Sequence, residues 1–172
     1  VKWFDIPAER VVNCRTYGGH GEEMAVFAST TSIDGKPLTE IIGTEALPAD
    51  EWEAMKVRVI QGGKHITALR GRFSFQSPAY LSIEMIAATM GGKPFRWPVG
   101  TYVNNDHFQH IMMAMETTVD AEGVHVKPVE GNKTEQAELQ KSYEHLCQLR
   151  DEVIKLGIMP PIDKWSEINP NL

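Results

Sequence analysis

The sequence has no long hydrophobic run and no block of basic residues. Its apolar stretches are broken by Glu, Thr or Gly before reaching the roughly 18 to 20 residues that a bilayer-crossing helix needs, so we expect no membrane association. Acidic residues outnumber basic ones by 23 to 17, and the net charge is -6. A nucleic-acid partner would require a positive footprint, so this class of partner is not expected.

Cysteine is also scarce, and the two that occur, Cys14 and Cys147, lie far apart in the chain. Their spacing is not that of a redox or zinc motif, and we interpret them as buried, reduced thiols. Reduced thiols are typical of a reducing compartment, so we expect a cytoplasmic location. The chain begins with neither Met nor a signal-peptide pattern, so we expect a processed protein or a piece of a longer one.

What is present is the composition of one folded domain, with 172 residues, 42% hydrophobic and 23% charged. Residues 11–17 and 24–31 have strand character, and a glycine-rich loop, 18–21, joins them. Asp50 is placed to cap a helix that ends at Gly62-Gly63. Ser77 is placed to cap a second helix, with Pro78 at its first position.

The second half of the chain predicts a β-hairpin and one long helix. Residues 111–119 and 124–129 have strand character and flank a turn at 120–123. Asn132 and Glu135 have the spacing of a capping box, and the helix that follows would end at Gly157. This order of elements predicts an α+β fold over 1–172, with antiparallel strands packed against long helices.

His20 is the best candidate for chemistry, because glycines flank it at the end of a predicted strand and leave the ring accessible. An imidazole is suited to donate or accept a proton near neutral pH. The glycine-rich stretches lack the G-x-G-x-x-G spacing of a dinucleotide site, so a dinucleotide would be held mainly elsewhere.

The stretch 18–24, which reads Gly-Gly-His-Gly-Glu-Glu-Met and runs on to the turn at 34–37, resembles the catalytic-histidine loop of the lactate and malate dehydrogenase family. Weaker similarities follow in order at 66–71, Ser77-Pro78 and Pro98-Val99. Together they span nearly the whole chain and resemble the C-terminal substrate domain of that family. Met24 makes the loop more similar to malate dehydrogenases than to lactate dehydrogenases.

The resemblance implies hydride transfer between NAD and malate or oxaloacetate, with His20 as proton donor and acceptor. It implies that NAD is bound mainly by an N-terminal Rossmann domain outside this chain, and that the substrate domain alone is inactive. Ser74 would bind substrate if the register after Gly71 shifts by one; otherwise Phe73 would crowd the pocket. The family also implies a homodimer or homotetramer.

Three alternatives stay open. The altered residues after Gly71 and around Asn104 fit a non-catalytic relative kept for subunit assembly, and lactate is an alternative substrate. An NAD-dependent glycosidase of the same superfamily would need a metal on Cys14 and His20. We predict no metal site, because residues three apart, such as His107 and His110, point to opposite faces of a strand. Arg15 is interpreted as a strand residue that faces solvent.

Overall fold

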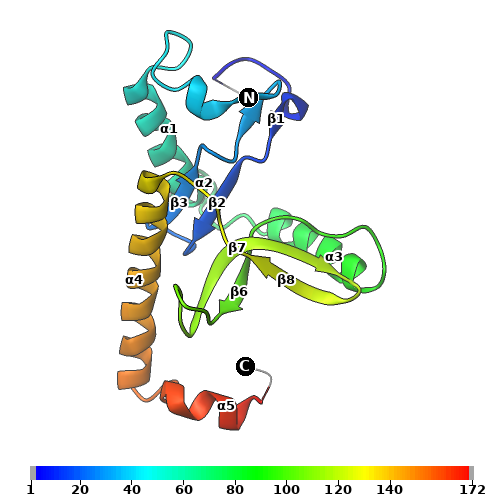
Figure 1. The fold of residues 1–172 in the computed structure, drawn as a ribbon, viewed down its shortest axis with the longest axis vertical. Helices are drawn as coiled ribbons and strands as arrows, with labels where there is room; N and C mark the ends of the chain where they lie inside the picture. The colour runs from blue at the N-terminus through cyan, green and yellow to red at the C-terminus, as the bar shows by residue number, and fades with distance from the viewer. Residues whose placement is uncertain (1–2, 171–172) are drawn as a thin grey trace.

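The computed structural model describes residues 3–170, whose strands form two antiparallel sheets (Figure 1). The larger sheet has the order β3-β2-β7-β6, and β8 pairs with the second half of β7. The smaller sheet has the order β1-β4-β5. The strands are β1 (Val11–Val12), β2 (Arg15–Gly18), β3 (Met24–Phe27), β4 (Ser32–Ile33), β5 (Lys36–Pro37), β6 (Val99–Val103), β7 (Ile111–Asp120) and β8 (Gly123–Lys127).

Five α-helices accompany the sheets within the described residues. They are α1 (Ala49–Ile60), α2 (Gly62–Arg70), α3 (Gln76–Thr89), α4 (Lys133–Lys155) and α5 (Trp165–Ile168). Helix α4, yellow to orange in Figure 1, packs against β3, β2 and β7, whereas α3 packs against β7. Antiparallel strands combined with long helices confirm the predicted α+β fold.

The hairpin and the long helix are confirmed. Asp120 pairs with Gly123 at the tip of the β7–β8 hairpin. At the start of α4, the side chain of Asn132 accepts hydrogen bonds from the backbone of Thr134 and Glu135, and the Glu135 carboxylate accepts one from the backbone of Asn132. These reciprocal bonds satisfy N–H groups that the first helical turn leaves unpaired.

The predicted strand over 11–17 is wrong as a single element. Asn13 has a φ of 55°, a left-handed conformation that breaks an extended chain. As a result β1 pairs with β4 in the small sheet, and β2 pairs with β3 in the large one. Cys14 lies at this break and is exposed, so its predicted burial is also wrong.

One predicted helix boundary is confirmed and two are wrong. Helix α1 ends at Ile60, just before Gly62-Gly63, as predicted, but a second helix, α2, begins directly at Gly62 and ends before Gly71, which has a φ of 67°. Asp50 lies inside the first turn of α1, where a carboxylate favours the helix dipole without capping it. Ser77 is likewise inside α3, which starts at Gln76, so its predicted capping role is not observed.

The main core lies between α4 and the large sheet. Leu139 of α4 is 1% exposed and packs among buried residues of β2, β3 and β7, including Tyr17, Phe27 and Met113. A second cluster, around Leu38 and Leu47, joins the small sheet to α1. A third places Ala88 of α3 against Phe95 and Val119.

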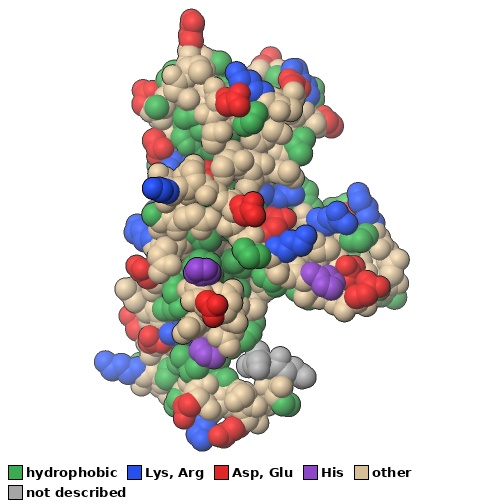
Figure 2. All heavy atoms as spheres, viewed as in Figure 1, with side chains coloured by type: hydrophobic (Ala, Val, Ile, Leu, Met, Phe, Trp, Pro, Cys, Tyr) green, Lys and Arg blue, Asp and Glu red, His purple; other side chains and the backbone are tan. Residues whose placement is uncertain are grey.

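Within residues 3–170, no helix is both long and apolar enough to cross a membrane. On the face seen in Figure 2, acidic and basic side chains are interspersed, and hydrophobic side chains lie among them.

Candidate active site

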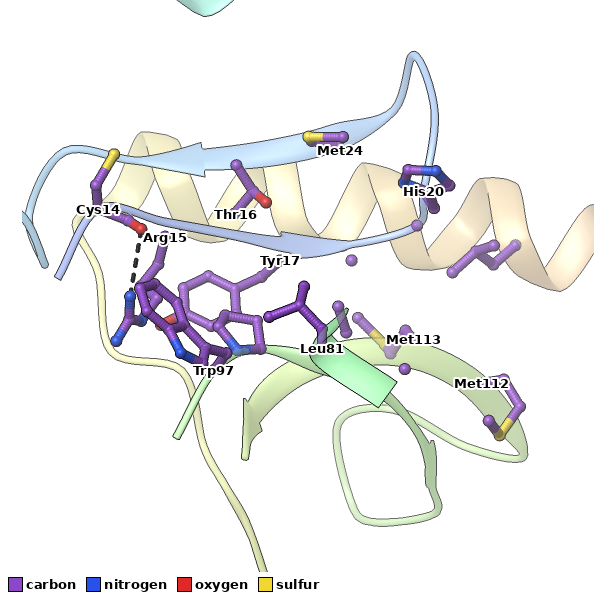
Figure 3. Close-up of a pocket in the computed structure, with 16 residues that line it drawn as sticks. Cys14, Arg15, Thr16, Tyr17, His20, Met24, Leu81, Trp97, Met112 and Met113 are labelled. Atoms are coloured by element: carbon purple, nitrogen blue, oxygen red, sulfur yellow. Dashed lines mark hydrogen bonds between the residues drawn. The ribbon is translucent and has the colours of Figure 1, made fainter. Parts of the chain in front are cut away.

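A hollow of about 700 Å³ lies over β2, the adjoining strands and part of α3, and His20 is in its wall (Figure 3). We call it the His20 hollow. Cys14 and His20 lie at opposite ends of β2, and Trp97, Leu81 and Met112 lie across from that strand. The hollow therefore runs along a strand and offers mostly apolar walls, with an imidazole at one end.

The turn that carries His20 is held by α4. Ser142, fully buried, accepts a hydrogen bond of 2.8 Å from the backbone N–H of Gly19. Gly18 has a φ of 87°, and a Cβ added to it would overlap the Ser142 hydroxyl and lie 2.8 Å from the Ser142 Cβ. Glycine is thus required both by the backbone angle and by the closeness of the helix. The exposed side chain of His20 projects from this fixed turn.

Two carboxylates on the same turn pair with lysines from different helices. Glu23 lies 2.9 Å from Lys141 of α4, and Glu22 lies 3.7 Å from Lys64 of α2. They do not form a carboxylate pair suited to acid–base work, because each faces its own cation. Exposed pairs of this kind contribute little to stability, about 0 to 1 kcal/mol each.

The far end of the hollow is lined by stacked and hydrogen-bonded side chains. The guanidinium of Arg15 lies 4.1 Å from the centre of the Trp97 ring, so Arg15 is partly buried rather than facing solvent. The Tyr17 hydroxyl donates a 2.6 Å hydrogen bond to Glu116. Burial, reinforced by this hydrogen bond, raises the pKa of Tyr17, so the phenol stays protonated in the neutral range.

Ser74 and His20 are not brought together in this hollow. Ser74 lies between α2 and α3, is partly buried, and is not part of the wall. Phe73 is 79% exposed and does not line the wall either. The segment 66–71 before it forms the end of helix α2 and its C-cap, Gly71.

Two other histidines, His110 and His125, have local partners. His125 lies 2.9 Å from Asp120 within the hairpin, and the Nδ1 of His110 lies 2.8 Å from the Tyr102 hydroxyl. Across residues 3–170, no group of three or more His, Cys, Asp or Glu side chains is arranged to hold a metal ion. Cys14 and His20, required by the glycosidase alternative, are at opposite ends of β2.

Sequence reasoning missed Ser142 and, for Glu135, predicted only the capping role. Ser142 positions the His20 turn, and Glu135 holds the end of β3 by accepting hydrogen bonds from the backbone of Ala28 and Ser29 at 2.8 and 2.9 Å. The burial of Ser142 could have been predicted, because it lies three residues after Leu139 on the apolar face of α4. A small polar residue on a buried stripe needs a hydrogen-bond partner.

The described residues thus form an α+β domain in which a glycine turn places an exposed histidine beside a largely apolar hollow. The sequence profile of the lactate/malate dehydrogenase alpha/beta C-terminal domain matches residues 2–156. The chain belongs to the lactate/malate dehydrogenase family and carries this domain.

Individual malate dehydrogenases also match this chain in sequence. The malate dehydrogenase of Thermomicrobium roseum is 30% identical over 135 residues, which cover 77% of this chain and 42% of that protein. The malate dehydrogenase of Staphylococcus carnosus is 34% identical over 109 residues, covering 62% and 33%. The chain therefore spans less than half the length of these curated relatives.

Solved structures share the fold. The malate dehydrogenase of Plasmodium falciparum superposes with a TM-score of 0.80 at 20% identity, covering 90% of this chain and 50% of that one. The lactate dehydrogenase of Cryptosporidium parvum, solved with lactic acid and β-nicotinamide adenine dinucleotide, gives 0.79 at 21% identity, covering 88% and 49%.

Proposed function

We propose that this chain is the substrate half of a malate dehydrogenase-like oxidoreductase, in which His20 exchanges a proton with the oxygen of malate or oxaloacetate. The observation that carries the proposal is the placement of His20. Its ring is exposed, lines a 700 Å³ hollow, and projects from a turn that α4 holds through Ser142. Family membership and the malate dehydrogenase relatives support the same reaction.

In the proposed reaction, the hydrogen on the hydroxyl-bearing carbon of malate leaves as hydride while its O–H proton passes to an unprotonated nitrogen of His20, and a C=O bond forms. In the reverse direction the protonated ring returns the proton to the carbonyl oxygen. NAD, when bound, would accept or supply the hydride. The fixed turn keeps the imidazole in place during the transfer, which lowers the entropic cost of bringing the groups together.

We propose that NAD is bound mainly by a separate N-terminal domain. Both sheets of residues 3–170 are antiparallel, so this part of the chain lacks the parallel strand–helix–strand unit that holds a dinucleotide pyrophosphate. Helix α3 supports this proposal, because Ile83 and Ile86 on the helix and Met90 just after its end are 65%, 59% and 82% exposed. An apolar helix surface of this kind is typical of a face that another domain covers.

Ser74 is proposed to hydrogen-bond the substrate through its hydroxyl. It lies just before α3 and is partly buried, but it is outside the His20 hollow. Contact therefore requires the segment 71–75 to close over the hollow when substrate binds. Ser74→Ala is expected to raise the KM for oxaloacetate with little change in kcat, and an unchanged KM would remove Ser74 from the site.

We propose that the protein forms a homodimer or homotetramer and that the surface of α1 and α2 makes the contact between subunits. Val57, Val59 and Leu69 are 51%, 50% and 74% exposed, and they place apolar side chains on adjacent helices. Sedimentation of the full natural protein would show the assembly, and Leu69→Glu is expected to weaken it if this surface is the contact.

The main test is NADH oxidation by the full natural protein that contains this chain, with oxaloacetate and pyruvate compared side by side. His20→Asn should lower kcat about 10² to 10⁴-fold, the usual contribution of a general acid. His65→Asn, at an exposed histidine of α2, is the matched control and should leave kcat unchanged.

The other outcomes separate the alternatives. A preference for pyruvate would identify a lactate dehydrogenase. A folded wild-type protein that oxidises NADH with neither acid would favour the non-catalytic assembly domain. The 172-residue chain alone should show no turnover. Turnover by this chain would refute the proposal that a second domain binds NAD.

A further inference from the structure

A second cavity, of about 480 Å³, lies where β6 and β7 meet the segment after α4. We call residues 157–170 the tail and this space the tail cavity. We propose that the tail cavity binds a small, flat, uncharged molecule that is largely apolar and carries one hydroxyl or amide group. Its volume lies within the range of about 300 to 1,000 Å³ that is usual for small-molecule sites.

Three aromatic rings form one wall of the tail cavity. Trp165 of α5 lies 6.2 Å from His110 and 6.5 Å from Tyr102, measured between ring centres, and both contacts are tilted or edge-on. The Tyr102 hydroxyl bonds His110 Nδ1 at 2.8 Å, and the Trp165 indole N–H donates to the Pro160 carbonyl at 2.8 Å. These polar atoms are already satisfied, so the wall offers ring surface to a ligand.

Aliphatic and thioether side chains complete the cavity. Met112 and Ile168, which line it, are 59% and 66% exposed, and Met159 lies beside them. Methionine is flexible and polarisable, so it adapts to flat rings of different shape. Leaving these apolar groups in water is unfavourable, and an apolar ligand would remove them from it.

The charge of the tail cavity favours an uncharged ligand. Among the described residues that line it, Arg150 is the one with a permanent charge, and its side chain is only 14% exposed. Its guanidinium lies 2.8 Å from Asp151 and donates to the carbonyls of Gln109 and His110 at 3.1 Å. The positive charge is thus compensated. Within residues 3–170, His110 Nε2 has no hydrogen-bond partner, and it is the group proposed to bind the ligand's polar atom.

The tail cavity goes beyond the proposed dehydrogenase function. The family profile matches residues 2–156, and half of the cavity lining comes from the tail that follows. Figure 1 shows α5 in red below β6, turned back from the end of α4. Met112 lines both this cavity and the His20 hollow, so a ligand of the tail cavity would touch a residue shared with the candidate active site.

The test titrates the 172-residue chain, labelled with ¹³C on its methionine methyl groups, with 2-naphthol, an uncharged flat molecule with one hydroxyl. The Met159 signal should shift with saturation, at a dissociation constant on the order of 0.1 to 1 mM for a ligand of this size. Met24, which lines only the His20 hollow, and the exposed Met90 should not shift.

Ile168→Trp fills the tail cavity and should weaken binding about tenfold or more. Ile158→Trp makes the same change in the tail, at a residue that is 74% exposed and outside the lining, and should leave binding unchanged. Equal binding by both variants, or a shift of Met24 or Met90 as large as that of Met159, would overturn the proposal. A failure here leaves the His20 assay unaffected, so the two proposals are tested separately.

Discussion

Gly18 is the residue on which the position of the His20 turn depends. Its φ of 87° disfavours a side chain, and an added Cβ would overlap Ser142. We expect Gly18→Ala to lower the free energy of unfolding by about 2 to 4 kcal/mol, combining backbone strain with overpacking. Urea unfolding measures the loss, and kcat of the full natural protein should fall as well, because the turn is displaced.

Gly35→Ala separates the two causes. Gly35 has a φ of 80° with nothing within 4 Å of an added Cβ, so it reports the backbone strain alone, about 1 kcal/mol. Combining Gly18→Ala with Ser142→Gly should recover part of the loss by removing the overlap. If Gly18→Ala costs no more than Gly35→Ala, the proposed contact with α4 does not constrain the turn.

Glu135 is a second residue whose substitution should lower stability, because it binds backbone groups that are distant in the sequence. Its carboxylate is 5% exposed and accepts hydrogen bonds from the backbone of Ala28, Ser29 and Asn132. Glu135→Gln sets an amide N–H₂ against one of these donors, so we expect a loss of about 1 to 3 kcal/mol in urea unfolding. Glu144→Gln, on the exposed side of α4, should change stability by less than about 0.5 kcal/mol, and equal losses would contradict the role of Glu135.

At the scale of elements, Lys56 joins α1 to α4. Its Nζ lies 2.9 Å from Glu138 and 3.0 Å from Glu53, and its side chain is 13% exposed. Burial lowers the pKa of Lys56, but the hydrogen bonds to Glu138 and Glu53 outweigh it, so the pKa is raised above 10.5. A raised lysine pKa stabilises the fold fully below 10.5, and this contribution is lost as pH rises through the raised value.

Lys56→Met should therefore lower the free energy of unfolding by about 1 kcal/mol near pH 8. The difference from wild type should shrink as the pH is raised above 10.5. Urea titrations across this interval measure both, and Lys133→Met, at an exposed position of α4, serves as the control. A difference that stays constant across the interval would show that the lysine acts through packing and not through its charge.

Elements that depend on local signals were predictable, and those that depend on distant contacts were not. The capping box of α4, the β7–β8 turn and the glycine turn of His20 follow from residues within a few positions of each other. The break at Asn13 does have a local signal, since asparagine adopts a positive φ more readily than most residues, but the β-branched and aromatic residues around it favour one continuous strand. The start of α2 at Gly62 was not predicted, because glycine has a low helix propensity.

The candidate site shows the same limit. The exposed position of His20 was predictable from its flanking glycines, but the hydrogen bond that fixes its turn to α4 joins Gly19 to Ser142, which are 123 residues apart in the sequence. The tail cavity was not predictable at all, because its walls come from three separate parts of the chain.

At the scale of the whole molecule, α3 is notable for its exposure. Within the described residues, most of its surface is not covered by another helix or strand. Only Ala88 of this fourteen-residue helix is buried, and it packs beside Phe95. Ile83, 65% exposed, should thus tolerate substitution in the 172-residue chain: Ile83→Gln is expected to change the free energy of unfolding by less than about 0.5 kcal/mol. Phe95→Ala, at a position 6% exposed, should cost about 3 to 5 kcal/mol and verifies that the assay responds.

The same substitution should behave differently in the full natural protein. If a nucleotide-binding domain covers α3, Ile83→Gln places an amide in an apolar contact and should cost about 1 to 3 kcal/mol there, measured by thermal or urea unfolding. The comparison isolates the contact, because the helix and its core neighbours are common to both proteins. An equally small effect in both would show that α3 faces solvent in the complete protein, and the proposed position of the second domain would have to be abandoned.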